Sequence, residues 1–289
     1  MRAAILCGIA ALPLVSMSCT SDRDSTGPSV SSHRVEVPPG QSSDVLPLTS
    51  LACGAQITSD VRLDNDLSCA GNALLVSGND IRIDLNGHTL SGNGSGNGIT
   101  VSASHRVTIF GGSVKGFQSG IFVGSSTQVV IRDNEFTATN QAVLLQATTA
   151  SVIKHNTVTK NVSRAFMVRP NLTGGLSTDN IVIGNLVIDT PTGIYLIRQP
   201  GNTILNNTVI GATVAGIDLF EGAGEVSGNI IKANHLTGGG AGIRFTAGWI
   251  DNTFVGNRIE GNACGTKGST AGNTFHGNVY SGNVSDACP

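Results

Sequence analysis

Side chains able to carry out acid–base chemistry lie close together in the last third of the chain. Asp218 and Glu221 are near neighbours, and Arg244 follows in the next repeat of the sequence. Two carboxyl groups beside a glycosidic bond can transfer protons, and an arginine can hold a charged sugar. The candidate catalytic residues are therefore Asp218, Glu221 and Arg244. The alternative is an ordinary surface ion pair between Asp218 and Arg244.

A second group of side chains has the chemistry of a binding surface for an anionic polymer. A guanidinium group can donate two parallel hydrogen bonds to a carboxylate or sulfate. Arg164, Arg169 and Arg198 lie in two successive repeats and could bind such groups. Aromatic side chains supply the broad apolar contact that a sugar ring can use. The candidate binding residues for a polysaccharide are Phe122, Tyr195, Arg169 and Arg198.

Short repeated segments must position these residues. A small residue followed by apolar, variable and apolar positions recurs every 22 to 28 residues, and its matches begin at Gly98, Gly120, Ala142, Ala165, Gly193, Gly216 and Gly242. An apolar strand that ends in asparagine recurs every 21 to 29 residues, with Asn134, Asn156, Asn185, Asn207, Asn234, Asn257 and Asn278. The two series stay in phase, which indicates a solenoid.

Stacked coils account for both patterns. A single coil cannot bury its apolar face, but stacked coils form a continuous core. Glycine and asparagine at the corners tolerate left-handed backbone angles, and stacked asparagines can hydrogen-bond from coil to coil. We therefore expect an all-β fold, a right-handed parallel β-helix of about nine coils of roughly 22 residues, over residues 49–289.

The third position of the first pattern should point away from the core, because side chains alternate along a strand. The residues at this position are Thr100, Phe122, Leu144, Met167, Tyr195, Asp218 and Arg244. They predict an exposed stripe that is apolar in the middle and charged towards its C-terminal end. Such a stripe is either covered by a loop, the N-terminal tether or a partner chain, or it is a surface on which sugars stack.

The stretch Ile83-Asp84-Leu85-Asn86-Gly87-His88-Thr89-Leu90-Ser91-Gly92 and the coils after it resemble the right-handed β-helix proteins of the pectin-lyase-like superfamily, of the bacterial exported or lipoprotein type. The resemblance covers roughly residues 53–285. It implies a structural role in the opening turn for Asp84, Asn86 and His88. It also implies a groove along one outer face, where enzymes of the superfamily act on polysaccharides.

The signatures of the catalytic families are missing. The chain has no Asp-Asp pair and no Arg-X-Lys, and Gly87-His88 is followed by threonine rather than glycine. No tight acidic cluster for calcium is visible, although Asp218 and Glu221 could contribute to one. We therefore expect a protein that binds polysaccharide or has a structural role at the surface. The alternative that the resemblance implies is a polysaccharide lyase, glycoside hydrolase or epimerase acting on an acidic glycan.

A further alternative is a periplasmic accessory protein resembling the β-helix factors of copper-enzyme maturation. Such a protein needs Met, His or Cys ligands clustered on one face. The chain has 3 methionines, of which Met1 and Met17 belong to the predicted export signal, and its histidines share no spacing. The sequence therefore predicts no metal site and no cofactor.

The N-terminus predicts export. Residues 1–19 have a basic start and a short apolar stretch, and residues 20–48 have the composition of a flexible linker. Cys19 is either lipidated or an incidental residue of a cleaved signal. We expect an exported protein, lipid-anchored in the cell envelope or extracellular, with membrane contact only through Cys19. A net charge of −2 does not indicate the basic surface that binds nucleic acid.

Four cysteines remain in the predicted β-helix, two near each end. They allow three pairings, and we expect the local one, Cys53–Cys69 and Cys264–Cys288. These bonds would hold the ends of the solenoid against fraying in an oxidising compartment. The oligomeric state is not indicated.

Overall fold

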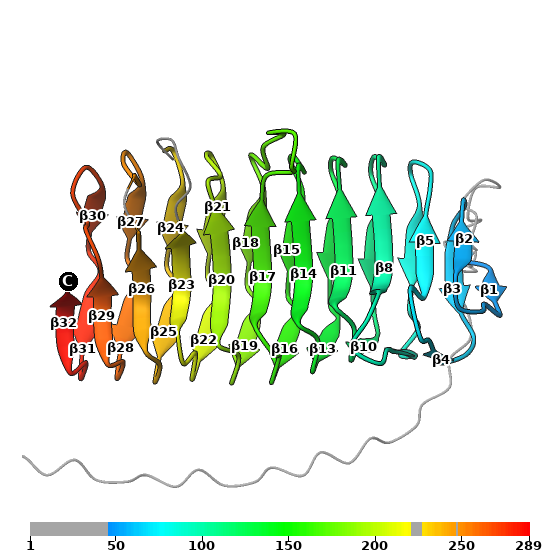
Figure 1. Ribbon diagram of the computed structural model, residues 1–289, viewed down its shortest axis with the longest axis horizontal. Coiled ribbons are helices and arrows are strands. Elements are labelled where there is room, and N and C mark those ends of the chain that lie inside the picture. The colour runs from blue at the N-terminus through cyan, green and yellow to red at the C-terminus, as the bar shows by residue number, and fades with distance from the viewer. Residues whose placement is uncertain (1–45, 221–226, 247) are drawn as a thin grey trace, which may run out of the picture. The chain divides into compact units, whose positions relative to one another are not determined.

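The computed structural model describes residues 46–220, 227–246 and 248–289, and they form a right-handed parallel β-helix (Figure 1). The chain rises along the front sheet, descends behind it, and advances in one direction with each turn. Every element of these residues is a strand, in about 10 turns of about 23 residues. The predicted all-β solenoid is confirmed, with one turn more than expected. The export signal, Cys19 and most of the predicted linker lie outside these residues.

Three parallel sheets line the solenoid, and each turn contributes one strand to each sheet. Within the described residues, sheet A has 11 strands: β1 (Leu48–Thr49), β3 (Val61–Leu63), β6 (Arg82–Asp84), β9 (Thr108–Phe110), β12 (Val130–Arg132), β15 (Val152–Lys154), β18 (Ile181–Ile183), β21 (Thr203–Leu205), β24 (Ile230–Lys232), β27 (Thr253–Val255) and β30 (Thr274–His276). Neighbouring strands pair without slippage, so each position stacks on its counterpart in the next turn.

Sheet B carries the longest strands and faces the viewer in Figure 1. The described part of the chain gives it 11 strands: β2 (Ala55–Ile57), β5 (Leu74–Val76), β8 (Asn97–Ser102), β11 (Ser119–Gly124), β14 (Gln141–Gln146), β17 (Arg164–Arg169), β20 (Thr192–Ile197), β23 (Ala215–Phe220), β26 (Ala241–Phe245), β29 (Cys264–Lys267) and β32 (Ser285–Cys288). Its length makes it the broadest of the three outer surfaces.

Sheet C closes each turn with short strands. It has 10 of them in the residues described: β4 (Leu67–Ser68), β7 (Thr89–Ser91), β10 (Ser113–Lys115), β13 (Glu135–Thr137), β16 (Thr157–Thr159), β19 (Leu186–Ile188), β22 (Thr208–Ile210), β25 (His235–Thr237), β28 (Arg258–Glu260) and β31 (Val279–Ser281). No helix in the described ranges is long and apolar enough to cross a bilayer.

The core is a column of apolar side chains inside the three sheets. Ile121, Val143 and Phe166 occupy equivalent places in successive strands of sheet B, and each is fully buried. Most strands of sheets A and C add one inward residue, such as Ile131 and Val158. Since every turn supplies the same apolar positions, the core continues from coil to coil.

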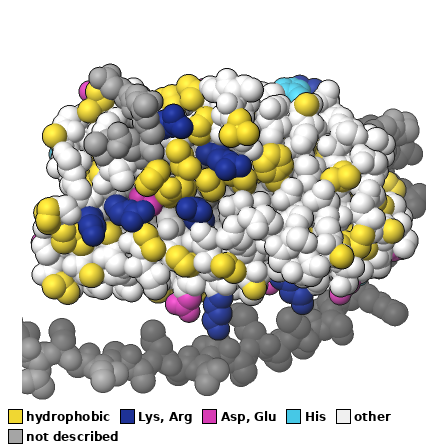
Figure 2. Space-filling view, in the orientation of Figure 1, with side chains coloured by type: hydrophobic (Ala, Val, Ile, Leu, Met, Phe, Trp, Pro, Cys, Tyr) yellow, Lys and Arg dark blue, Asp and Glu magenta, His cyan; other side chains and the backbone are white. Residues whose placement is uncertain are grey.

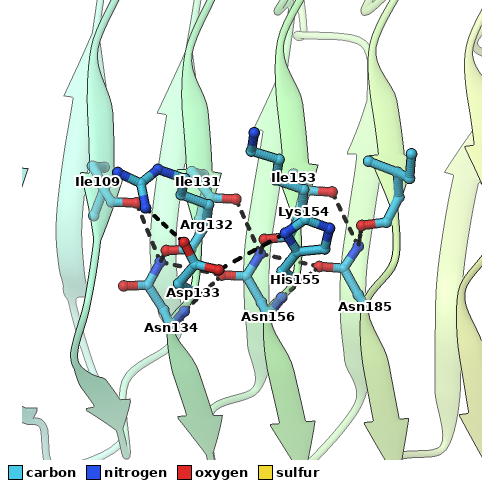
Figure 3. A network of polar contacts seen from close by, with 11 residues as sticks. Ile109, Ile131, Arg132, Asp133, Asn134, Ile153, Lys154, His155, Asn156 and Asn185 are labelled. Atoms are coloured by element: carbon cyan, nitrogen blue, oxygen red, sulfur yellow. Dashed lines mark hydrogen bonds and ion pairs between the residues drawn. The ribbon is translucent and has the colours of Figure 1, made fainter.

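A ladder of asparagines occupies the corner between sheets A and C (Figure 3). The side-chain amide of Asn156 donates to the carbonyl oxygens of Ile131 and Lys154 and to Oδ1 of Asn185, each at 3.0 Å. Its backbone N–H also donates to Asn185 Oδ1, at 2.9 Å. The predicted ladder is confirmed through Asn134, Asn156, Asn185, Asn207, Asn234, Asn257 and Asn278.

Two features of the corners differ from the expectation. The residue with left-handed backbone angles is the one before each ladder asparagine, and it is often not glycine. Asp133, His155 and Ala233 have φ values of 55°, 53° and 53°. A second ladder, absent from the sequence analysis, lies between sheets B and A and comprises Asn180, Asn202, Asn229, Asn252 and Asn273. The ladder bonds offset the cost of about 1–2 kcal/mol of a left-handed non-glycine residue.

Asn185→Ala should lower the free energy of unfolding by about 2–4 kcal/mol. It removes the acceptor of the buried Asn156 N–H and the donor to the carbonyl oxygens of Ile153 and Ile183. Denaturant titration followed by circular dichroism measures the change. Asn93→Ala is the control, since exposed Asn93 bonds only to Ser95 within its own turn. Equal losses in both variants would contradict a stabilising role for the ladder.

The two predicted disulfides are both present. Cys53 bonds Cys69 near the N-terminal end, and Cys264 of β29 bonds Cys288 of β32, the last strand of sheet B. The second bond therefore ties the final coil to the coil before it.

Replacing Cys264 and Cys288 with serine should loosen the final coil. A cross-link that closes 24 residues contributes about 3 kcal/mol, because it restricts the unfolded chain. Hydrogen exchange should become faster in β30 to β32 and stay unchanged in β8 to β20. The paired control, serine at Cys53 and Cys69, should leave the C-terminal exchange as it is. Unaltered exchange in β30 to β32 of the first variant would exclude this role.

Candidate functional site

The outward surface of β11 to β29 in sheet B, called the sheet-B face below, gathers the predicted site residues. Its central column follows the strand register, one residue per strand: Phe122, Leu144, Met167, Tyr195, Asp218, Arg244 and Lys267. Neighbours in the column are separated by about 4.8 Å, the spacing of paired strands. Figure 2 shows hydrophobic side chains over the middle of this face and Lys and Arg side chains around them.

The middle of the column is apolar, as predicted, but it is not exposed. Leu144, Met167 and Tyr195 form a cluster separate from the core and are only 3%, 6% and 6% exposed. The expected exposed stripe is therefore wrong at these positions, because neighbouring side chains on the same face cover it. Phe122 and Ile197, both partly buried, pack against the cluster.

Tyr195 is held between a cation and a second ring. The Arg164 guanidinium lies 4.2 Å from the centre of the Tyr195 ring, and the Phe220 ring centre lies 5.7 Å away. Burial raises the pKa of the Tyr195 hydroxyl above its ordinary value. The arrangement fixes an arginine over an aromatic ring at the centre of the face.

The arginines of this face retain unused hydrogen-bond donors. Nε of Arg164 and Nε of Arg169 are buried, and neither has a hydrogen-bond partner. Arg198 is exposed at the corner after β20, and Lys267 is exposed at the end of β29. Within the described residues, no carboxylate forms an ion pair with any of these four cations.

Asp218 and Arg244 form the ion pair that was the alternative to catalysis. Arg244 donates from Nε to Asp218 Oδ1 at 2.9 Å and from Nη2 to Oδ2 at 2.5 Å. The Asp218 side chain is 1% exposed and that of Arg244 is 32% exposed, so a buried carboxylate is paired with a partly exposed guanidinium. The hydrogen bonds with Asp218 raise the pKa of the Arg244 guanidinium further. Glu221, the third candidate catalytic residue, lies outside the described residues.

A cavity that the sequence analysis missed lies at the N-terminal end of the face. It has a volume of about 440 Å³, and its walls include Phe122, Gln146, Asn171 and Leu172. The loop 170–176 after β17 forms one wall and stands above the neighbouring turns in Figure 1. One feature of the sequence could have indicated this cavity. The longest spacing between matches of the first pattern, 28 residues from Ala165 to Gly193, marks an inserted loop.

The motif around His88 makes structural contacts. Asn86 has a φ of 51° in the tight turn, and its side-chain amide donates to the Leu63 carbonyl oxygen at 2.9 Å. His88 Nδ1 lies 2.9 Å from Asp66 Oδ1. The Thr89 backbone N–H and His88 hold the pKa of Asp66 below its ordinary value. These contacts join the first turns, as the superfamily resemblance implied.

A protein-family model described as "Periplasmic copper-binding protein (NosD)" matches residues 55–211 and 169–288. The chain belongs to this NosD family. Membership of a periplasmic family, together with two disulfides, indicates an exported protein. A search of curated protein sequences found no match for this NosD-family chain.

Solved structures of low identity share the fold of this NosD-family protein. The mannuronan C-5 epimerase AlgE4 A-module of Azotobacter vinelandii aligns over 84% of this chain and 87% of its own, with 13% identity and a TM-score of 0.60. An alginate lyase from Paenibacillus sp. str. FPU-7 aligns over 77% and 91%, with 17% identity and a TM-score of 0.55.

The tailspike protein of E. coli bacteriophage HK620, solved with a pentasaccharide, aligns over 78% of this chain with 12% identity and a TM-score of 0.59. The chain spans about half of the tailspike's length (50%). At these identities the shared feature is the parallel β-helix itself.

Copper is named in the family description, but the described residues do not fit a copper site. Proteins hold copper with clustered thiolate, thioether or imidazole groups. All four cysteines of the described region are in disulfides, and Met167 is its one methionine. The same region has no group of three His, Cys, Asp or Glu residues that could hold a metal ion. We therefore assign no copper-dependent step to this protein.

Asp218→Leu should lower the free energy of unfolding by about 1–3 kcal/mol, because it leaves the half-buried Arg244 guanidinium without its carboxylate. Chemical denaturation measures the loss. The double variant Asp218→Leu/Arg244→Met should recover most of it, since neither charge then remains. A double variant less stable than Asp218→Leu would show that the ion pair does not account for the effect.

Proposed function

We propose that this protein is exported to the cell envelope, where it binds an anionic polysaccharide along the sheet-B face. The proposal rests on the cations of this face that have no acidic partner among the described residues: Arg164, Arg169, Arg198 and Lys267. The Arg164 guanidinium lies over the buried Tyr195 ring. We also propose that a lipid on Cys19 anchors the protein. The mass of the N-terminal peptide tests the anchor.

Unused N–H groups favour an anionic ligand. A ligand carboxylate or sulfate can accept hydrogen bonds from the partly exposed guanidinium groups of Arg164 and Arg169, which have no carboxylate partner among the described residues. Arg164 is already held over Tyr195, so little side-chain freedom would be lost when it binds. The face is therefore organised for binding before the ligand arrives.

The shape of the face favours an extended polymer. Seven strands from β11 to β29 present outward residues in register, over a length of about 29 Å at about 4.8 Å per strand. A linear glycan laid along the axis would pass Phe122, the Arg164–Tyr195 pair and Lys267 in turn. The names of two structural neighbours refer to mannuronan and alginate, and a third holds a pentasaccharide.

Binding is better supported than turnover. Both carboxylate oxygens of Asp218 accept hydrogen bonds from Arg244, so Asp218 would have to leave this ion pair before it could act as an acid or base. If turnover occurs, Asp218 and the sequence-predicted Glu221 are the proposed acid and base, with Arg244 paired to Asp218.

Replacing Arg164, Arg169 and Arg198 together with glutamine should weaken binding to alginate or polygalacturonate at least about tenfold. Wild-type binding should weaken as salt rises, because exposed charges are screened beyond about 8 Å at physiological salt. Isothermal titration calorimetry at two salt concentrations measures both effects.

A charge-matched control lies on sheet A, where Arg132, Lys154 and Lys232 can be replaced by glutamine. This triple variant loses the same net charge and should bind as the wild type does. Equal weakening in both triple variants would show a general charge effect rather than a binding face. A wild-type protein that bound no acidic glycan would overturn the proposed function.

A further inference from the structure

The cavity beside loop 170–176 is free of charged side chains, unlike the rest of the sheet-B face. Its lining includes the apolar groups of Phe122 and Leu172, the amides of Gln146 and Asn171, and the hydroxyls of Ser125 and Thr173. Rings with apolar faces and hydroxyl groups at their edges make the contacts that such a lining offers. The lining therefore suits an uncharged sugar.

The loop that walls the cavity is held in place. Asn171 Oδ1 accepts hydrogen bonds from the backbone N–H of Thr173 at 3.1 Å and of Gly175 at 2.6 Å. A Cβ at Gly175 would lie 2.9 Å from the Asn171 amide and 3.2 Å from Ala147, so glycine lets the loop close onto the body. The cavity is thus formed before a ligand binds.

Two large apolar side chains line the cavity, and of these only Phe122 also packs against the apolar cluster of the sheet-B face. Leu172 is 102% exposed on this fixed loop, where it packs against nothing. The Phe122 ring lies over Gly124, where a Cβ would approach it to 2.8 Å. Glycine at position 124 therefore allows the ring to form the floor of the cavity. Both apolar groups are available to a ligand.

The Arg169 guanidinium lies next to the cavity. Ser102, Gly124, Gln146 and Arg169 stack in register on four successive strands, and the first three line the cavity. Arg169 Nη2 donates to Gln146 Oε1 at 3.4 Å, so the guanidinium lies at the cavity's edge. A polymer with an uncharged unit in the cavity would place its next unit beside Arg169.

We infer that this cavity is a subsite for a neutral sugar, and that the polymer is a mixed glycan containing both neutral and acidic units. The inference rests on the proposed binding of an anionic polysaccharide and narrows its class. Charge alone would favour polymers made only of uronic acids, since they carry more charge per length. A preference for mixed polymers would therefore come from the cavity.

The test compares two mixed polymers, hyaluronan and xanthan, with two all-uronate polymers, polygalacturonate and alginate, by calorimetry at one salt concentration. At least one mixed polymer should bind about fivefold or more tightly than both all-uronate polymers. Leu172→Asn should remove this difference and change all-uronate binding less than about twofold. Gly124→Ala, which displaces the Phe122 ring, should also remove this difference.

Leu176→Asn is the matched control, because Leu176 lies on the same loop, is 46% exposed and does not line the cavity. It should leave all four affinities unchanged. All-uronate polymers that bind as tightly as both mixed ones, and lose affinity in the triple arginine variant, would overturn the neutral subsite and leave the proposed function standing. Binding of none of the four polymers would overturn both.

Discussion

Hydrogen bonds between identical positions of successive turns are the constraint on which this structure depends. A corner of a solenoid interrupts the strand ladder and would leave buried N–H and carbonyl groups unpaired. Asn156 resolves this with one side chain, which receives bonds from the turn before it and donates bonds to the turns on both sides. Such corners are satisfied only when turns stack in strict register.

Strict register also builds the sheet-B face. Residues that are separated by more than twenty positions in sequence become neighbours at strand spacing, so Arg164 reaches Tyr195 and Arg244 reaches Asp218. The core and the face are made by the same strands, with alternate residues turned inward and outward. Ladder, core and outer face are therefore products of one repeat, and the inserted loop 170–176 adds a local departure that forms one wall of a cavity.

The repeat period was enough to predict the fold and the outward column, and the placement of two cysteines near each end was enough to predict both disulfides. It could not predict the burial of Leu144 and Met167, because that depends on how long side chains of neighbouring turns lie across the sheet. Nor could spacing decide whether Asp218 was free to react, since the bidentate geometry of Arg244 depends on rotamers. The cavity escaped prediction because its wall depends on Asn171 and Gly175 closing one irregular loop.

Successive turns repeat the same asparagine hydrogen bonds, and this repetition has an evolutionary consequence. A duplication of one complete turn brings its own asparagine, its own inward residues and its own outward residue, so it can enter the stack without breaking its neighbours' bonds. A partial duplication would leave corner groups unpaired and would be removed by selection. The length of the outer face can therefore change only in whole steps of about 4.8 Å. Gene duplication thus gives this architecture a way to match its surface to longer or shorter glycans.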